Sequence, residues 1–503
     1  MASSMLLVIL IFACFSASCA EVLFLPLKHS LAGARFNRTP HHLLKSTAAH
    51  SAARFHRHHQ HRHLSSSTAQ QQVSLPLLPG SDYTLSLTVA SRPPQSVSLY
   101  MDTGSDLVWF PCSPFTCILC DGKPKPKPAT LNFSSSTAST VSCQSASCSA
   151  AHSSTLLPSS DLCAIARCPL DSIETSDCDS YPCPPFYYAY GDGSFTARLH
   201  RHTVSIPMSS PPLVLPNFTF GCAHSALGEP VGVAGFGRGV LSLPAQLLKL
   251  SPQLGNQFSY CLVSHSFDAN QVNQPSLLIL GRSKSKQKSS GSGSRGGIKF
   301  VFTPMLDNPR HPYFYSVGLM GVSVGKKNIP APIFLTEIDG KGNGGMVVDS
   351  GTTFTMLPAT LYNAVVAELD YQLGRVRKRA KEIEAQTGLS PCYYIDDKAA
   401  KSDVPNLSLH FAGDGKSSSM VLLPRANYFY EFVDGSSGPR KGRTVGCLMI
   451  INGGDEADLA GGPGAILGNY QQQGFEVVYD LEKKRVGFAR QHCSSLWDNL
   501  KQR

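Results

Sequence analysis

Asp102-Thr103-Gly104-Ser105 and Asp349-Ser350-Gly351-Thr352 repeat one short pattern in the two halves of the chain. Each copy directly follows an apolar run, at residues 97–101 and 345–348. Each therefore predicts a buried strand that ends in a tight glycine turn and holds one carboxylate. Two such turns can face each other, and a pair of adjacent carboxylates cannot fully ionise near neutral pH. The repeat thus predicts one site that contains both an acid and a base.

Length and composition agree with a repeated, two-part fold. The chain has 503 residues, of which 42% are hydrophobic, which is enough to bury two sizeable cores. It contains 42 glycines and 35 prolines but few long helical patterns, which favours a mainly β protein with many turns.

The net charge of +10 is unevenly distributed. Residues 1–72 hold seven Lys or Arg and one Glu, so they carry +6 and the remainder only +4. The remainder has no basic stripe interleaved with aromatic residues, so we exclude nucleic acid as a partner.

The first residues predict secretion. Residues 1–20 contain a short apolar core and end in Ser18-Cys19-Ala20, which is typical of a cleaved signal peptide. The polar C-terminal end lacks a lipid-anchor signal, and no later run is long enough for a membrane span, so we expect no membrane anchor. Asn132, Asn217 and Asn406 each begin an Asn-x-Ser/Thr sequon, so we expect them to be glycosylated during secretion.

Cysteine usage fits an oxidising compartment. Fourteen cysteines remain after the signal peptide, an even number that would suit seven disulfides, although the spacing does not give their connectivity. The alternative for Cys117 and Cys120 is a zinc site, which secretion disfavours. We therefore expect no metal and no cofactor.

Residues 21–75 do not have the pattern of a folded core. They contain nine of the 17 histidines and end in a Ser/Gln-rich stretch. One interpretation is a His-rich propeptide that covers an acidic site and is released when its histidines become charged. The other is a disordered or weakly metal-binding tract.

Several segments predict local structure. Strands are expected at residues 83–89 and 313–319, and hairpins at 188–195 and 475–488. Pro358 begins a helical pattern, and the charged residues 375–384 read as its solvated continuation. Residues 283–297 are a flexible, basic, low-complexity segment.

Together these features resemble the pepsin-like aspartic proteases, specifically the atypical nepenthesin-like plant branch. The resemblance rests on both aspartyl turns, the hairpin at residues 190–194, a paired apolar-Gly motif at 233–236 and 465–469, and the cysteine-rich insertion after Cys112. It implies a mainly β, bilobal pepsin-like acid protease fold with the active site in the cleft between two β-rich lobes. The lobes would span residues 76–297, with the insertion and flap, and 298–503.

The resemblance also implies roles for the two turns. Asp102 and Asp349 would be catalytic and would activate one water molecule. Ser105 and Thr352 can hold the outer carboxylate oxygens, and Gly104 and Gly351 permit the tight turns. Thr103 and Ser350 would bond across to the opposite loop.

A flap would contact the substrate through Tyr190, Gly191 and Asp192, and Trp109 would support Tyr190 or simply fill the core. After the flap the family usually has Thr-x-Gly, whereas this chain has Thr196-Ala197-Arg198 and lacks that glycine, which affects the expected flap mobility or subsite shape.

The leading hypothesis is a secreted aspartic endopeptidase, active in acid, made as a zymogen and cutting between bulky hydrophobic residues. It would be a monomer with a protein or peptide substrate, in the apoplast, the cell wall or the vacuole. The alternative is a weakly active or inactive protein of the same fold that binds or inhibits cell-wall-degrading enzymes. The two intact aspartyl turns favour the protease.

Overall fold

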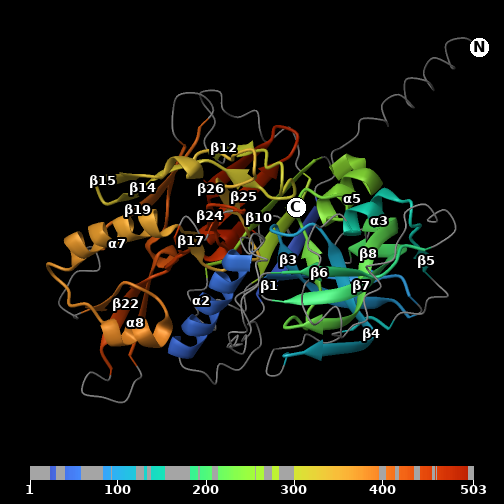
Figure 1. The fold of residues 1–503 in the computed structure, drawn as a ribbon, viewed down its shortest axis with the longest axis horizontal. Coiled ribbons are helices and arrows are strands. Elements are labelled where there is room, and N and C mark those ends of the chain that lie inside the picture. Colours follow the sequence, from blue (N-terminus) through green and yellow to red (C-terminus); the bar gives the residue numbers. More distant parts are fainter. Residues whose placement is uncertain are drawn as a thin grey trace, which may run out of the picture.

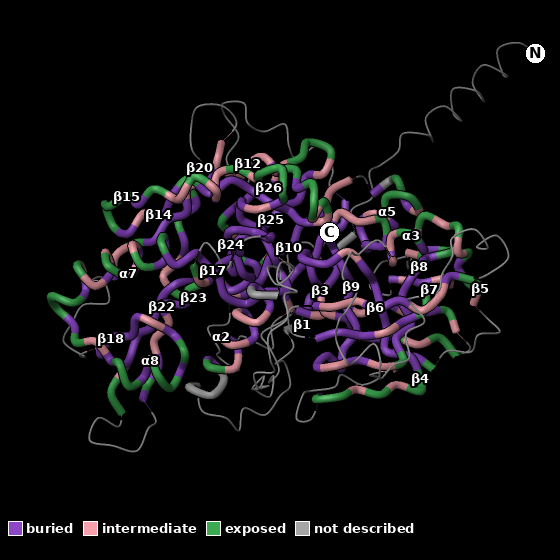
Figure 2. Tube along the Cα trace, viewed as in Figure 1, coloured by how far each residue is buried: buried purple, intermediate pink, exposed green. Residues whose placement is uncertain are grey.

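The computed structural model shows a mainly β protein with two β-rich lobes, one from each half of the sequence (Figure 1). The structure describes residues 23–29, 40–57, 83–91, 93–120, 130–132, 138–152, 182–190, 193–206, 213–254, 256–264, 275–281, 299–395, 404–413, 419–434, 442–455, 459 and 461–496. The predicted signal peptide, Gly191, Asp192 and the segment 283–297 lie outside these residues. Buried residues run continuously through the middle of both lobes (Figure 2).

One 19-stranded hydrogen-bonded sheet joins the two lobes. Its strands from the first half are β1 (Leu23–His29), β2 (Tyr83–Val89), β3 (Gln95–Asp102), β4 (Val108–Ile118), β5 (Ser139–Thr140), β6 (Phe186–Ala189), β7 (Ser194–Ile206), β8 (Leu213–Leu227), β9 (Val233–Gly235), β10 (Gln257–Cys261) and β11 (Ser276–Leu280). Those from the second half are β12 (Val301–Leu306), β13 (Ser316–Val317), β16 (Met346–Val348), β17 (Thr355–Leu357), β23 (Ile450–Asn452), β24 (Ala465–Leu467), β25 (Phe475–Asp480) and β26 (Arg485–Arg490).

Two smaller sheets and several helices complete the molecule. The sheets consist of β14 (Leu319–Val324), β15 (Lys327–Pro330), β19 (Leu407–Phe411) and β20 (Ser419–Leu422), and of β18 (Cys392–Ile395), β21 (Phe429–Val433) and β22 (Thr444–Leu448). The described helices are α2 (Pro40–Arg57), α3 (Ala146–His152), α5 (Leu243–Leu250), α7 (Ala359–Leu373), α8 (Lys381–Thr387), α9 (Asn469–Gln472) and 3-10 turns at Pro252–Leu254, Ile333–Leu335 and Arg425–Asn427. Among the residues described, no helix is both long and apolar enough to cross a membrane.

Most of the local predictions are confirmed. Strand β2 has the predicted bounds, and its side chains alternate between buried and half-buried as a strand with one wet face requires. Strands β25 and β26 form the antiparallel hairpin predicted at residues 475–488. Strands β6 and β7 form the hairpin predicted at 188–195, pairing Ala189 with Ser194. The strand predicted at 313–319 is shorter and divided between β13 and β14.

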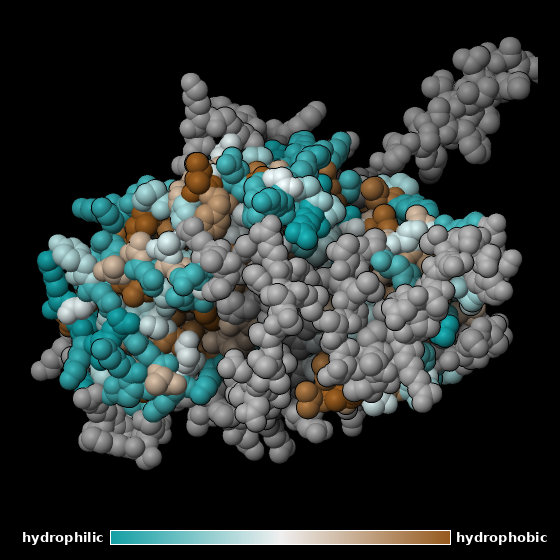
Figure 3. Space-filling view, viewed as in Figure 1, coloured by the Kyte–Doolittle hydropathy of each residue, from teal (hydrophilic) through white to brown (hydrophobic). Residues whose placement is uncertain are grey.

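The helix after Pro358 ends earlier than the charge pattern suggested. Helix α7 stops at Leu373, and a turn follows before α8, so the expectation of a continuous solvated helix over 375–384 is wrong. Gly374 is the C-cap residue, with its N–H donating to the Asp370 carbonyl, and Arg377 in the following turn is buried. The described surface over α7 and α8 is mainly hydrophilic (Figure 3), consistent with an outer, solvated side for both helices.

The expectation that residues 21–75 lack a folded core is wrong for two segments. Strand β1 pairs antiparallel with β11 and continues alongside β2, burying Leu25 and Leu27. Helix α2 packs against α8 and β17. The sequence analysis missed the short Leu-Pro-Leu strand and the apolar side of α2, because histidines and other polar residues dominate the composition of this region.

Disulfides cross-link the described residues in both lobes. The pairs are Cys112–Cys222, Cys117–Cys120, Cys148–Cys183, Cys261–Cys493 and Cys392–Cys447. The Cys117–Cys120 bond rules out the zinc alternative at these residues, because an oxidised sulfur pair is not a thiolate ligand set. Cys163, Cys168 and Cys178 lie outside the described residues.

Candidate active site

The two aspartyl turns meet at the centre of the molecule. Asp102 ends β3, which runs parallel to β9, while Asp349 follows β16, which runs parallel to β24. The apolar-Gly motifs singled out in the sequence thus form the strand beside each turn. Both carboxyl groups are almost fully buried, with 2% of Asp102 and 1% of Asp349 exposed.

Reciprocal hydrogen bonds fasten one turn to the other. The Thr103 backbone N–H donates to Ser350 Oγ at 3.0 Å, and the Ser350 N–H donates to Thr103 Oγ1 at 2.8 Å. Each hydroxyl then donates onward to a backbone carbonyl of the opposite half, Val348 or Met101, at 3.1 Å. Because every bond has a counterpart, the contact has local two-fold symmetry.

The glycines allow the carboxylates to approach. The N–H of Gly104 donates to Asp102 Oδ1, and that of Gly351 donates to Asp349 Oδ1, each at 2.9 Å. A Cβ atom at Gly104 would lie 2.8 Å from Asp349 Oδ1, and one at Gly351 would lie 2.3 Å from Asp102 Oδ1. A side chain at either position would therefore collide with the carboxylate of the opposite turn.

The outer hydroxyl groups of the two turns differ. Thr352 Oγ1 donates to Asp349 Oδ2 at 2.6 Å. By contrast, Asp102 Oδ2 and Ser105 Oγ are buried and have no hydrogen-bond partner among the described residues. The predicted hydroxyl bond is therefore formed in the second turn, whereas in the first turn Ser105 Oγ makes no bond of normal geometry with a described residue but still helps to lower the pKa of Asp102.

Arg54 joins the two carboxylates, and the sequence analysis missed it. Its Nη2 lies 2.5 Å from Asp102 Oδ1, and its Nε lies 3.1 Å from Asp349 Oδ2. Arg54 projects from α2, whose neighbouring Phe55 is buried against Val347 and Met356. Ser51 Oγ of the same helix accepts the N–H of Phe354 at 3.0 Å. The helix thus inserts a cation into the space between the turns.

The two carboxyl groups have opposite pKa shifts. Burial opposes ionisation of Asp102, but the charge and hydrogen bond of Arg54 outweigh it and hold the pKa below its ordinary value of 3.8. Burial raises the pKa of Asp349 to about 6; the Arg54 charge opposes this rise, and the Asp102 charge adds to it. The pair can therefore hold one acid and one base, the requirement for activating a water molecule.

The predicted flap tyrosine lies above Asp102. Tyr190 follows β6, and its phenolic oxygen accepts the Trp109 Nε1–H at 2.5 Å. Trp109 is fully buried and stacks on Phe195 of β7, with ring centroids 4.3 Å apart. Trp109 thus both fills the core and contacts the flap tyrosine. Gly191 and Asp192 lie outside the described residues.

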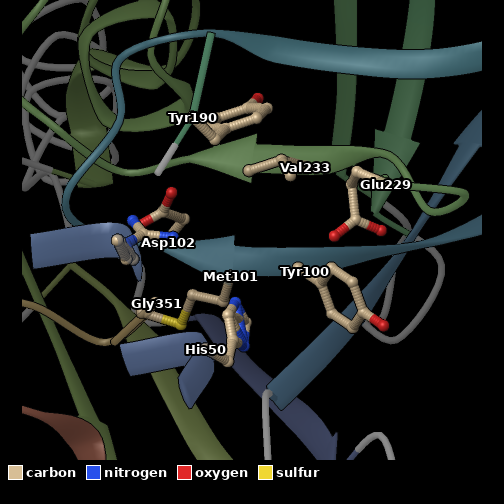
Figure 4. Close-up of a pocket in the computed structure, with 9 residues that line it drawn as sticks. His50, Tyr100, Met101, Asp102, Tyr190, Glu229, Val233 and Gly351 are labelled. Atoms are coloured by element: carbon tan, nitrogen blue, oxygen red, sulfur yellow. The ribbon is translucent and has the colours of Figure 1, made fainter. Parts of the chain in front are cut away.

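A cavity adjoins Asp102 on the side of the first lobe (Figure 4). Its lining comprises His50, Arg54, Tyr100, Met101, Asp102, Tyr190, Glu229, Val233 and Gly351. Glu229, in the loop between β8 and β9, was not singled out from the sequence, because no repeat or periodic pattern marks it. Its carboxylate adds a third buried acid to the site.

The remaining predicted sites lie on the outside. Asn132, Asn217 and Asn406 are exposed, so each side chain is accessible to modification. Cys148, His152 and Cys183 are grouped closely enough to suggest a metal site, but the two cysteines form a disulfide. These three residues therefore lack the thiolates that such a site would need.

Two family models match the chain in succession. One, described as "Xylanase inhibitor N-terminal", matches residues 83–282, and the other, described as "Xylanase inhibitor C-terminal", matches residues 314–490. A "probable aspartyl protease" of Arabidopsis thaliana is 59% identical over 497 residues, covering 96% of each chain. "Aspartic proteinase nepenthesin-2" of Nepenthes gracilis is 30% identical over 430 residues, covering 84% of this chain and 81% of its own.

Solved structures share the fold. A crystal structure described as edgp superposes with a TM-score of 0.59 at 17% identity, covering 94% of this chain and 96% of that one. Basic 7S globulin from soybean gives a TM-score of 0.58 at 18% identity, with coverages of 95% and 99%. Similarity at this level of identity bears on the fold alone.

Proposed function

Because the chain belongs to the plant family of pepsin-like aspartyl proteases, we propose that it is a secreted aspartic endopeptidase, made as a zymogen and active in acid. The observation that carries the proposal is the buried Asp102–Asp349 pair, fastened by reciprocal bonds and bridged by Arg54. The paired carboxyl groups support the chemistry, and the Arg54 bridge between them supports an inhibited state.

The reaction needs one ionised and one protonated carboxyl group. A water molecule between Asp102 and Asp349 loses a proton to the ionised carboxylate as it attacks the scissile carbonyl, which the protonated carboxyl group polarises. Both carboxyl groups are buried in one site, and the charge of Asp102 raises the pKa of Asp349, so the pair favours one ionised and one protonated group, which supports this division of roles. Their burial strengthens each electrostatic contact, and closure of the flap over the substrate would exclude further water.

Helix α2 acts as the inhibitory segment in this proposal. The Arg54 guanidinium occupies the position between the carboxylates that the water needs, and it holds Asp102 in the charged form. Phe55 and Ser51 hold the helix in place on either side of Arg54 along the chain. Protonation of the carboxylates in acid removes their attraction for Arg54, which favours release of the helix.

The second candidate is a binding protein that acts on cell-wall-degrading enzymes. The description of the matching family models as xylanase inhibitor domains favours it. Both aspartyl turns of this chain keep the aspartate, glycine and hydroxyl residues, which a binder does not require. We therefore rank the protease first.

Acid treatment of the purified full chain tests the proposal. Incubation at about pH 3–4, where one carboxyl group of such a pair is ionised, should release an N-terminal fragment containing α2 and start cleavage of a denatured protein. A statine-type inhibitor, which mimics the tetrahedral intermediate, should block both events. N-terminal sequencing gives the processing site. A chain that stays intact and inactive in acid, yet binds and inhibits a xylanase, would instead establish the second candidate.

A further inference from the structure

The cavity beside Asp102 has an unusual wall for a site expected to accept bulky apolar side chains. Tyr100 and Val233 contribute rings and methyl groups, but Glu229 contributes a carboxylate. Glu229 lies at one end of the cavity and Asp102 at the other in the view of Figure 4. Only 9% of Glu229 is exposed. The cavity therefore combines an apolar passage with a buried negative end.

Local contacts hold Glu229 in this position. Its Oε1 accepts the N–H of Val231 at 2.9 Å. A Cβ atom at Gly193, which follows the flap turn, would lie 3.2 Å from the Glu229 Cβ, so the flap strand packs directly against this residue. Together with burial and the Asp102 charge, the Glu229 charge raises the pKa of Tyr190. Contacts with the start of the flap strand β7 and with its own loop between β8 and β9 thus hold Glu229 in place.

The helix that contributes one wall of the cavity, α2, is basic. His50 and Arg54, one helical turn apart on α2, both line it. The sequence of α2 contains no Asp or Glu. Helix α2 therefore contributes basic groups, and not a large aliphatic side chain, to the wall that also contains Asp102 and Glu229.

We propose that Glu229 makes this cavity a subsite for the cationic side chain of lysine or arginine, at a substrate position flanking the scissile bond. The inference rests on the proposed protease function. Tyr100 and Val233 would cover the aliphatic stem of such a side chain, and Glu229 would bind its charged end. A leucine side chain in the same place would remove water from the carboxylate without supplying a donor, which is unfavourable.

Matched peptides test the inference in the acid-activated full chain. The peptides differ only in having Lys or Leu at each position flanking the cut, and kcat/KM is compared at about pH 5, above the ordinary pKa of glutamate. The wild type should prefer Lys at one of these positions by about tenfold or more. Glu229→Gln, which keeps an oxygen for the Val231 N–H, should reduce the Lys-to-Leu ratio by about tenfold.

Two further variants separate charge from structure. Glu229→Asp keeps the charge and should retain a preference for Lys. Glu476→Gln is the matched control, because it removes a buried carboxylate of β25, which accepts a bond from Ser259 Oγ, outside the cavity. Its ratio should equal that of the wild type.

The outcomes distinguish the two proposals. Cleavage with a preference for Leu, or a ratio unchanged in Glu229→Gln, would overturn the subsite and leave the protease function intact. No cleavage of any peptide would overturn the protease function and the subsite with it.

Discussion

The two aspartyl turns have nearly the same sequence and backbone but different surroundings. Each ends a strand beside a parallel apolar-Gly strand, and each contains an N–H bond to its own carboxylate at 2.9 Å. Around them the symmetry is lost. The Asp102 carboxylate has the shorter contact with Arg54, whereas Asp349 alone receives a hydroxyl bond, from Thr352.

This difference shows that the acid–base division does not come from the turns themselves. The pKa of Asp102 is lowered by a cation from α2, and that of Asp349 is raised to about 6 by burial. Residues distant in the sequence therefore decide which of two similar carboxyl groups ionises first. Variants of each turn and of Arg54 can break or sharpen this comparison.

The largest effect is expected when either carboxylate is neutralised. Asp102→Asn and Asp349→Asn should each lower proteolytic activity by about 10²- to 10⁴-fold, because each removes one partner of the acid–base pair. Cleavage of a denatured protein in acid measures the loss, after removal of the pro-segment by an added protease. Activity close to wild type in either variant would contradict the proposed chemistry.

The same two variants should differ in how firmly they hold α2. Asp102→Asn removes the partner at 2.5 Å, and Asp349→Asn the one at 3.1 Å. Limited proteolysis of α2 at neutral pH should therefore be faster in Asp102→Asn. Equal rates would show that the two carboxylates contribute equally to docking of the helix.

The next effect concerns Arg54 and the pH of activation. The pKa of Asp102 is lowered while α2 is docked, so this carboxylate favours docking of α2 at any pH above its ordinary pKa of 3.8. That contribution is lost as the pH falls through the lowered pKa. Asp349 gains its proton already near pH 6, so below that pH the Asp102 contact is the remaining charged link. The wild type should therefore stay unprocessed at about pH 5 and activate below about pH 4.

Arg54→Ala should move processing up to about pH 5, because it removes the cation that competes with protons for Asp102. Arg54→Lys should lie between the two, since it keeps the charge but not the two-atom contact. Arg238→Ala, which breaks an exposed pair with Asp307, is the control. An unchanged pH threshold in Arg54→Ala would show that Arg54 does not hold the inhibited state.

A smaller and equal effect is expected in the symmetric part of the contact. Thr103→Ala and Ser350→Ala each leave one buried N–H and one carbonyl without its hydroxyl partner. Each should lower the free energy of unfolding by about 1–3 kcal/mol. Urea unfolding of both variants, with the helix-cap variant Ser242→Ala as a reference for a bond outside the site, measures the effect. Clearly unequal losses would contradict the two-fold symmetry.

The sequence predicted the symmetric features of the site and missed the asymmetric ones. Both turns and their supporting strands carry local patterns, because a buried strand followed by a glycine turn has a recognisable order of residues. Arg54 has no such pattern, since its partners lie 48 and 295 positions away. The apolar side of α2 was also missed, because the composition of the histidine-rich region is mainly polar. Glu229 lies in a loop, where neither helical nor strand periodicity marks a buried side chain.

The smallest effect should separate the two outer hydroxyl groups. Thr352 donates to Asp349 Oδ2 at 2.6 Å and stabilises its ionised form, whereas Ser105 Oγ contributes to lowering the pKa of Asp102 without a hydrogen bond of normal geometry to a described residue. Thr352→Ala should therefore raise the apparent pKa of the activity profile by up to about one unit, equivalent to about 1.4 kcal/mol. Ser105→Ala should shift it less. If the two shifts are equal once the pro-segment has been removed, the difference between the turns depends on Arg54 alone, and the hydroxyl groups become equivalent when α2 leaves.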